Sequence, residues 1–121
     1  MGKKILVIDD NEVDLLIVKR YLTHEGFSDI ITASGASEGV EKAKTEKPDL
    51  VISDTLLPGS NGFEVCRQVR KIYGPDKPKI IIITGAIDAV DAVQAKKSEA
   101  DDYCAKTSDC APLLEAIKKL I

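Results

Sequence analysis

Short apolar runs and longer amphipathic stretches follow one another regularly along the chain. The runs predict strands, and the stretches with apolar residues three or four positions apart predict helices. The predicted strands cover residues 4–10, 29–33, 50–54, 79–84 and 102–106, and the predicted helices cover residues 11–25, 36–47, 63–73, 87–97 and from about 110 onward. Gly26, Pro48 and Gly74 are expected to end the first three helices, and Asp109 is expected to cap the last one.

The helical spacing also predicts which side chains face the core. The expected inward residues of the first helix are Leu15, Leu16, Val18, Tyr21 and Leu22, and those of the third are Val65, Cys66, Val69, Ile72 and Tyr73. The turn-rich segment 58–62, between the third strand and the third helix, is expected to be a loop.

Alternation of strands and helices predicts an α/β fold with a parallel sheet and right-handed crossovers. The first, third and fourth strands are continuously apolar, as strands covered on both faces are, whereas the second and fifth are short and mixed, as edge strands are. We therefore expect one domain, residues 1–121, with a doubly wound five-stranded parallel sheet in the flavodoxin-like order 2-1-3-4-5, counted along the chain, and five helices.

Acidic residues follow two of the central strands. Asp9 and Asp10 end the first strand and Asp54 ends the third, and the predicted order places the switch point of the sheet between these strands. Two like charges 4 Å apart cost about 4 kcal/mol near a protein surface, so this trio requires either a bound cation or, in its absence, one acid that stays protonated. Oxygen ligands of this kind suit Mg²⁺, which also pairs with phosphate.

Two further strand ends point at the same rim. Thr84 closes the fourth strand and Lys106 the fifth. An ammonium group and a cation neutralise the charge of a transferring phosphoryl group, and a hydroxyl donates a hydrogen bond to it. The set predicts that Asp54 is a nucleophile that accepts a phosphoryl group.

Composition narrows the partners. The net charge of −3 gives no basic surface for nucleic acid or an anionic membrane. No apolar run approaches the roughly 18 residues of a membrane span, and no signal-peptide pattern is present. The three cysteines lack metal-ligand spacing and are expected to be reduced thiols, which favours a cytoplasmic location.

Over essentially its full length the chain resembles a response-regulator receiver domain of two-component signalling, of the kind found in chemotaxis regulators. The residues that carry the resemblance are Asp9, Asp10, Asp54, Pro58, Gly62, Thr84 and Lys106. Their separations, 44 residues from Asp10 to Asp54, 30 from there to Thr84 and 22 to Lys106, also resemble those of the family.

The resemblance implies a role for each matching residue. Asp54 would accept the phosphoryl group from a phosphohistidine of a histidine kinase or a histidine phosphotransfer protein. Mg²⁺ or Mn²⁺ would be held by Asp9, largely through water, by Asp10 and Asp54, and by the backbone carbonyl of Leu56. Lys106 would pair with the phosphoryl group.

The resemblance further implies a switch. Thr84 would move toward the phosphoryl group, and Tyr103 would change rotamer in step. The fourth helix, fifth strand and fifth helix, about residues 88–121, would form the surface that meets a downstream effector or, after phosphorylation, a second copy of the chain. Such a domain is regulatory rather than an enzyme with a separate substrate. The chain stops at its last helix, so we expect no output domain within it, as in a single-domain regulator or a piece of a longer protein.

Several residues depart from the family pattern. Thr107 stands where a proline usually follows the lysine through a cis peptide, so the Lys106–Thr107 bond is either trans, with a reshaped loop, or held cis by the site. Glu99 replaces a glycine after the fourth helix, and Gly39 replaces an alanine within the second. Leu56 and Ala86 offer no polar group to an attacking water, which predicts slow autodephosphorylation.

Other functions fit less well. Neither a P-loop nor a Rossmann glycine pattern is present, and the acidic residues after the first strand would repel a flavin phosphate. A haloacid-dehalogenase-type phosphatase would need a second acid where Leu56 stands, and no histidine is placed to activate a nucleophile. The remaining alternative is a receiver-like module that binds a partner protein without phosphorylation, which Thr107 alone favours.

Overall fold

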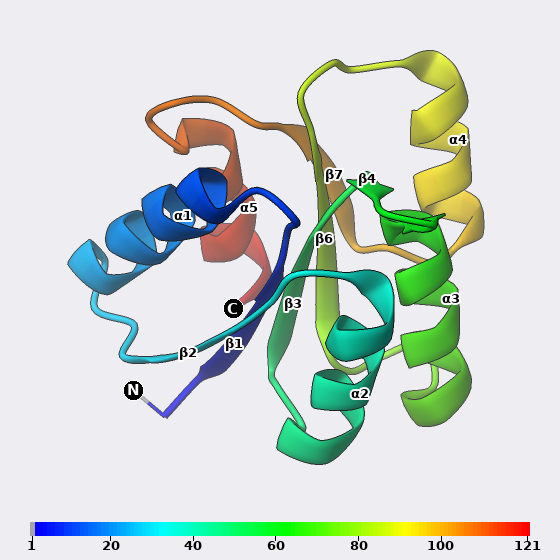
Figure 1. Cartoon of the computed structure of the whole chain (residues 1–121), viewed down its shortest axis with the longest axis horizontal. Coiled ribbons are helices and arrows are strands. Elements are labelled where there is room, and N and C mark those ends of the chain that lie inside the picture. Colours follow the sequence, from blue (N-terminus) through cyan, green and yellow to red (C-terminus); the bar gives the residue numbers. More distant parts are fainter. Residues whose placement is uncertain (1) are drawn as a thin grey trace.

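Five parallel strands form the central layer of the molecule in a computed structural model that describes residues 2–121 (Figure 1). The strands are β1 (Lys4–Ile8), β2 (Asp29–Ala33), β3 (Leu50–Asp54), β6 (Lys79–Thr84) and β7 (Asp102–Ala105). They pair in the order β2-β1-β3-β6-β7, and every pairing is parallel. Counted along the chain, this is the order 2-1-3-4-5, so the predicted fold class is confirmed.

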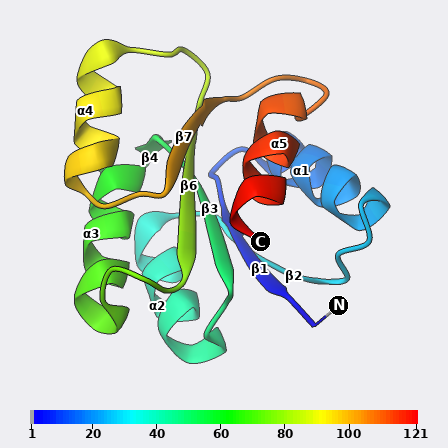
Figure 2. The ribbon, with the colours of Figure 1, turned by 180° about the vertical axis from the view of Figure 1, so that it is seen from behind.

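Helices cover both faces of the sheet. The two helices α1 (Glu12–His24) and α5 (Ala111–Leu120) lie on one face, and α2 (Ala36–Glu46), α3 (Gly62–Tyr73) and α4 (Ala89–Lys97) lie on the other (Figure 1; Figure 2 shows the same layers from behind). Because the strands are parallel, the loops that follow β1, β3, β6 and β7 lie together at the carboxyl end of the sheet.

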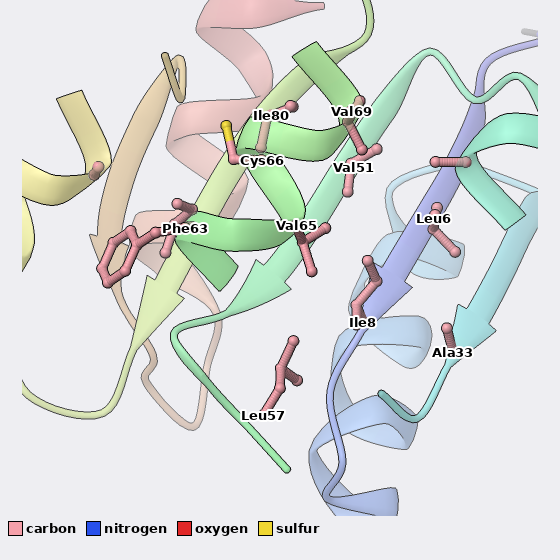
Figure 3. Packing of buried hydrophobic residues seen from close by; sticks show 13 residues of the cluster. Leu6, Ile8, Ala33, Val51, Leu57, Phe63, Val65, Cys66, Val69 and Ile80 are labelled. Carbon is pink, nitrogen blue, oxygen red and sulfur yellow. The ribbon is translucent and has the colours of Figure 1, made fainter. Parts of the chain in front are cut away.

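The two layers of helices create two apolar clusters, because successive residues of a strand point to opposite faces. Leu6, Ile8, Val51 and Ile80 point toward α2 and α3, where α3 places side chains such as Val65 over them (Figure 3). The cluster on the opposite face joins Ile5, Val7, Leu50, Ile52, Ile81 and Ile83 to Val18, Leu22, Leu113 and Ile117 of α1 and α5. The strand residues of both clusters named above are at most 1% exposed, which confirms that the central strands are covered on both faces.

Some predicted boundaries were wrong by one or two residues. Strand β1 ends at Ile8 rather than at position 10. Helix α4 begins at Ala89 rather than at position 87, because the carboxylate of Asp88 accepts the N–H groups of the first turn and starts the helix there. The N-cap of α5 is Cys110 rather than Asp109, although the Asp109 carboxylate still accepts a hydrogen bond, from the N–H of Ala111.

The sequence prediction missed a small hairpin and misplaced two side chains. Strand β4 (Leu56–Leu57) directly precedes the expected loop 58–62 and pairs antiparallel with β5 (Ser60–Asn61), which lies inside it. Leu16 and Ile72 are 67% and 43% exposed rather than inward, because each lies at the edge of its helix's apolar stripe. The cysteines are free thiols, as expected. Within residues 2–121, no helix is both long enough and apolar enough to cross a bilayer.

Two departures from the family pattern have local explanations. A Cβ on Gly39 would overlap Cδ1 of Ile8. Helix α2 therefore packs so closely on β1 at this point that only a residue without a side chain fits. Glu99 follows the C-cap of α4 with a positive φ of 68°, so a non-glycine residue adopts the left-handed conformation there.

Candidate functional site

Three carboxylates meet where β1 and β3 end. The pairing of Ile8 with Ser53 brings the following residues, Asp9 and Asp54, side by side. Carboxylate oxygens of Asp9, Asp10 and Asp54 all lie within 4.8 Å of one another. Asp9 is buried, Asp54 is half-buried and Asp10 is exposed, so the cluster forms a short gradient from the sheet to the solvent. The structure thus brings together the three acids that the sequence placed at adjacent strand ends.

The start of α1 holds Asp9 in position. The backbone N–H of Asn11 donates to Oδ1 of Asp9 at 3.0 Å, and the side chain of Asn11 caps the helix by accepting from the N–H groups of Val13 and Asp14. Because the cap sits two residues beyond Asp9, the acidic pair is confined to the short turn between β1 and α1. Asp9 is left with its second oxygen facing the cluster.

Lys106 reaches into the cluster from the end of β7. Its backbone N–H donates to the carbonyl of Thr84 at 2.7 Å, which fixes the start of the side chain. Its Nζ donates to Asp9 at 2.8 Å, to Asp14 at 2.9 Å and to Asp54 at 3.1 Å. The cis peptide bond among the described residues is Lys77–Pro78, so the Lys106–Thr107 bond is trans and Lys106 reaches the acids from a trans peptide.

Asp14 is the member of this site that the sequence analysis missed. It lies in the first turn of α1, three residues after the N-cap Asn11. Its contact with Lys106 spans 92 residues of sequence. Its place in the first turn of a predicted helix was the available signal, but acidic residues are common there on any solvated helix.

Burial and ion pairing act against each other at these groups. Burial raises the pKa of Asp9, and the hydrogen bonds from Lys106 and from the N–H of Asn11 offset only part of that effect. Burial lowers the pKa of Lys106, but its hydrogen bonds with Asp9, Asp14 and Asp54 outweigh burial and raise that pKa well above its usual value. Lys106 is therefore firmly cationic at neutral pH.

The donor set fits a hard divalent cation. Three carboxylates, on Asp9, Asp14 and Asp54, contact the Lys106 ammonium, and Asp10 lies beside Asp9 and Asp54, so the ionised acids outnumber the single cation of the site. The oxygens of Asp9, Asp10 and Asp54 are close enough to share one ion. An all-oxygen set with few protein ligands and an open, exposed side is suited to Mg²⁺, which retains several waters.

Thr84 and the loop after it form another wall of the site. The Thr84 hydroxyl donates to the carbonyl of Ala86 at 3.0 Å and accepts from the N–H of Ala86 at 3.2 Å, so it is engaged with its own loop. Tyr103 is half-buried on β7, and its hydroxyl accepts a hydrogen bond from the N–H of Asp88 at 3.3 Å. Both predicted switch residues therefore contact the segment that links β6 to α4.

A cavity of about 540 Å³ adjoins these residues. Its lining includes Asp14, Asp54, Leu56, Thr84, Ala86, Asp91 and Lys106. Because Asp54 and Lys106 both line this cavity, a small anionic group inside it can approach the Asp54 carboxylate and the Lys106 ammonium together. Leu56, which lines the same cavity, is 76% exposed and brings no polar side-chain group to it.

Gly62 closes the site from behind. Its N–H donates to the carbonyl of Thr55 at 2.9 Å, and a Cβ at this position would overlap the carbonyl oxygen of Asp54. The first turn of α3 therefore packs directly on the backbone of Asp54, and the β4–β5 hairpin bridges the short distance between them. This close packing fixes the backbone that carries the Asp54 carboxylate.

Comparisons with known proteins identify relatives. The family model described as "Response regulator receiver domain" matches residues 5–118. The chain is 42% identical over 108 residues to the alkaline phosphatase synthesis transcriptional regulatory protein PhoP of Bacillus subtilis, which covers 88% of this chain and 43% of that protein. It is 35% identical over 102 residues to the transcriptional regulatory protein AfsQ1 of Streptomyces coelicolor, covering 84% and 44%. The chain thus spans less than half the length of these relatives.

Solved structures show the same similarity. The response regulator TrrA of Thermotoga maritima, in complex with Mg²⁺-BeF, superposes with a TM-score of 0.88 at 34% identity, covering 98% of this chain and 99% of that one. A CheY-like receiver domain protein of Methanospirillum hungatei gives a TM-score of 0.86 at 32% identity, covering 97% and 91%. The chemotaxis protein CheY4 of Vibrio cholerae gives 0.91 at 24% identity over the full length of both chains, a likeness of fold.

Proposed function

The chain belongs to the response regulator receiver domain family, and we propose that its Asp54 accepts a phosphoryl group from a phosphohistidine of a histidine kinase or histidine phosphotransfer protein. Receiver domains are the regulatory domains of two-component response regulators. The observation that carries the proposal is the half-buried Asp54 carboxylate, which lines a cavity and lies beside two other acids and 3.1 Å from the Lys106 ammonium. The family model matches residues 5–118, and we propose that the receiver domain comprises residues 1–121.

The proposed transfer needs few groups from the protein. An oxygen of Asp54 attacks phosphorus, the bond from phosphorus to the imidazole nitrogen breaks, and an acyl phosphate remains on Asp54. Asp9, Asp10, Asp54 and the backbone carbonyl of Leu56 would hold Mg²⁺ or Mn²⁺, which supplies positive charge beside the equatorial oxygens. The complex of TrrA with Mg²⁺-BeF supports this assignment by analogy. Lys106, whose ammonium lies 3.1 Å from the Asp54 carboxylate, would contribute a second positive charge.

The same contacts support a phosphate-dependent switch. Lys106 already reaches Asp54, so replacement of the usual proline by Thr107 does not remove the lysine from the site. This favours phosphorylation over the alternative of a constitutive binding module. We propose that the Thr84 hydroxyl leaves Ala86 for a phosphoryl oxygen and that Tyr103, which contacts the same loop through Asp88, changes rotamer with it.

The proposed output surface comprises α4, β7 and α5. Exposed apolar side chains at the start of this surface, Ile87, Val90 and Val93, supply contact area for an unidentified downstream effector or for a phosphorylation-dependent homodimer. Because the chain carries an overall charge of −3, we propose that this domain contacts neither nucleic acid nor a membrane. We also propose that it is located in the cytoplasm.

We further propose that the acyl phosphate hydrolyses slowly. Leu56 and Ala86 line the cavity beside Asp54 and carry no polar group that could orient an attacking water. The domain therefore catalyses only its own phosphorylation and a slow loss of the group. Its phosphoryl half-life in the purified protein should be minutes or longer, and a half-life of seconds would refute this part of the proposal.

Intact-mass measurement tests the proposed function. The purified chain is incubated with a small acyl phosphodonor and Mg²⁺, alongside Asp54→Asn and a sample in which EDTA replaces the metal. We expect one phosphoryl adduct on the wild type with Mg²⁺ and none in the other two samples. An equal adduct on Asp54→Asn, or none on the wild type, would overturn the assignment.

A further inference from the structure

Lys106 has no donor to spare. An ammonium group carries three hydrogens, and Nζ of Lys106 donates to three carboxylates, on Asp9, Asp14 and Asp54, at 2.8, 2.9 and 3.1 Å. A phosphoryl oxygen on Asp54 can therefore bind Lys106 only if one of these contacts is given up. Which carboxylate leaves determines how readily the phosphorylated state forms.

The three carboxylates differ in how firmly they are held. The Asp9 side chain is 1% exposed and also accepts from the N–H of Asn11, so solvent cannot replace Lys106 there. Asp54 becomes the acyl phosphate itself. The Asp14 side chain is 29% exposed, and within residues 2–121 its hydrogen-bonding partner is Lys106. Water can replace that single contact, so Asp14 is the carboxylate that leaves at the lowest cost.

We propose that Asp14 is a positioning residue that competes with the phosphoryl group for Lys106, holding the ammonium in the unphosphorylated state and releasing it to the phosphoryl oxygens when Asp54 is modified. This inference rests on the proposed function of Asp54. It assigns Asp14 a regulatory effect on that site, which is to set the position of the equilibrium between the two states.

Two effects of Asp14 act in the same direction. Its ion pair with Lys106 stabilises the unphosphorylated state, and its negative charge repels the phosphoryl group, which carries nearly two negative charges at neutral pH. Removing the charge while keeping the shape of the side chain, as in Asp14→Asn, weakens the first effect and abolishes the second. Asp14→Asn should therefore favour the phosphorylated state. If Asp14 instead helped to aim Lys106 at the phosphoryl group, the same change would disfavour that state.

Asp91 provides a matched control. Like Asp14 it lies in the first turn of a helix, is partly buried and lines the cavity beside Asp54. Among the contacts of the described chain, however, Lys106 pairs with Asp14 and not with Asp91. Asp91→Asn therefore removes the same charge from the same cavity without releasing Lys106.

The test measures the affinity for beryllofluoride, a phosphoryl mimic, by titration at saturating Mg²⁺, so that changes in metal affinity do not enter. We expect Asp14→Asn to bind beryllofluoride about tenfold more tightly than the wild type, and Asp91→Asn to change the affinity less than twofold. In a Lys106→Met background the effect of Asp14→Asn should fall to the level of the Asp91→Asn control, because the competition requires the lysine.

The outcomes separate this inference from the proposed function. If the wild type binds beryllofluoride and Asp14→Asn binds it equally or more weakly, the competition is refuted while the role of Asp54 stands. An equal gain in Asp91→Asn, or a gain that persists in Lys106→Met, would likewise refute it by showing a general charge effect. If the wild type neither binds beryllofluoride nor accepts a phosphoryl group, both proposals fail.

Discussion

Replacement of Gly39 by alanine sets two opposing effects against each other. Alanine in place of a glycine within a helix stabilises it by up to about 1 kcal/mol. The added Cβ, however, would overlap Cδ1 of Ile8 and lie 2.9 and 3.2 Å from its Cγ1 and Cγ2. Overpacking of a core costs about 1–3 kcal/mol. Ile8 is fully buried and β-branched, so its side chain has little freedom to turn away, and we expect the cost to lie at the upper end.

The expected net result is a loss of about 1–2 kcal/mol in the free energy of unfolding, measured by urea denaturation with linear extrapolation. A double-mutant cycle with Ile8→Val identifies the cause, because valine lacks Cδ1. Ile8→Val alone should cost about 0.5–1.5 kcal/mol, and the double variant should be about 1 kcal/mol more stable than the sum of the single changes predicts.

Ser37→Ala is the control for helix propensity, because Ser37 is exposed on the same helix and its replacement should change the stability by less than about 0.5 kcal/mol. The packing explanation would be wrong if Gly39→Ala were as stable as the wild type or more so. Strict additivity in the cycle would also contradict it.

Three further predictions concern the buried cation of α3, the half-buried thiol of Cys104 and the switch. Arg70→Ala should lower the free energy of unfolding, measured in urea, by about 3 kcal/mol, because the Arg70 side chain is only 4% exposed and its removal leaves its partners unpaired. Arg67→Ala, which removes an exposed ion pair, should lower the free energy of unfolding by less than about 0.5 kcal/mol. Burial raises the pKa of Cys104 to about 12, so its alkylation rate by iodoacetamide should keep rising tenfold per pH unit beyond pH 9; a plateau near 9 would refute this. Lys106→Ala should still bind Mg²⁺ but lose the amide-shift changes near Tyr103 that beryllofluoride causes in the wild type.

The order of elements was predictable from the sequence because glycine and proline residues mark where helices and strands end. Strands β2, β3 and β6 have the predicted bounds, and Pro48 before β3 and Gly85 after β6 interrupt the neighbouring pattern. The start of α4 was harder to place, since Ile87 continues the apolar pattern while the Asp88 side chain makes the cap. The β4–β5 hairpin has strands of two residues each, which is too short for any periodicity to show.

The site was predictable to the extent that it follows from the sheet. Residues at the carboxyl ends of neighbouring parallel strands must lie at one edge, so the positions of Asp9, Asp54 and Lys106 followed from the strand order. The contact of Asp14 with Lys106 did not follow, because it depends on the length and direction of a lysine side chain across 92 residues of sequence. The trans geometry of the Lys106–Thr107 bond was one of two alternatives that the sequence left open.

The central claim is that Asp54, among the four aspartates of the site, becomes the acyl phosphate. Borohydride reduces an aspartyl phosphate to homoserine, which marks the modified residue permanently. We therefore propose to treat the phosphorylated chain with borohydride and to map the homoserine by peptide mass spectrometry. Homoserine at position 54 alone is the predicted result, and homoserine at position 9, 10 or 14, or at none of the four, would contradict the account.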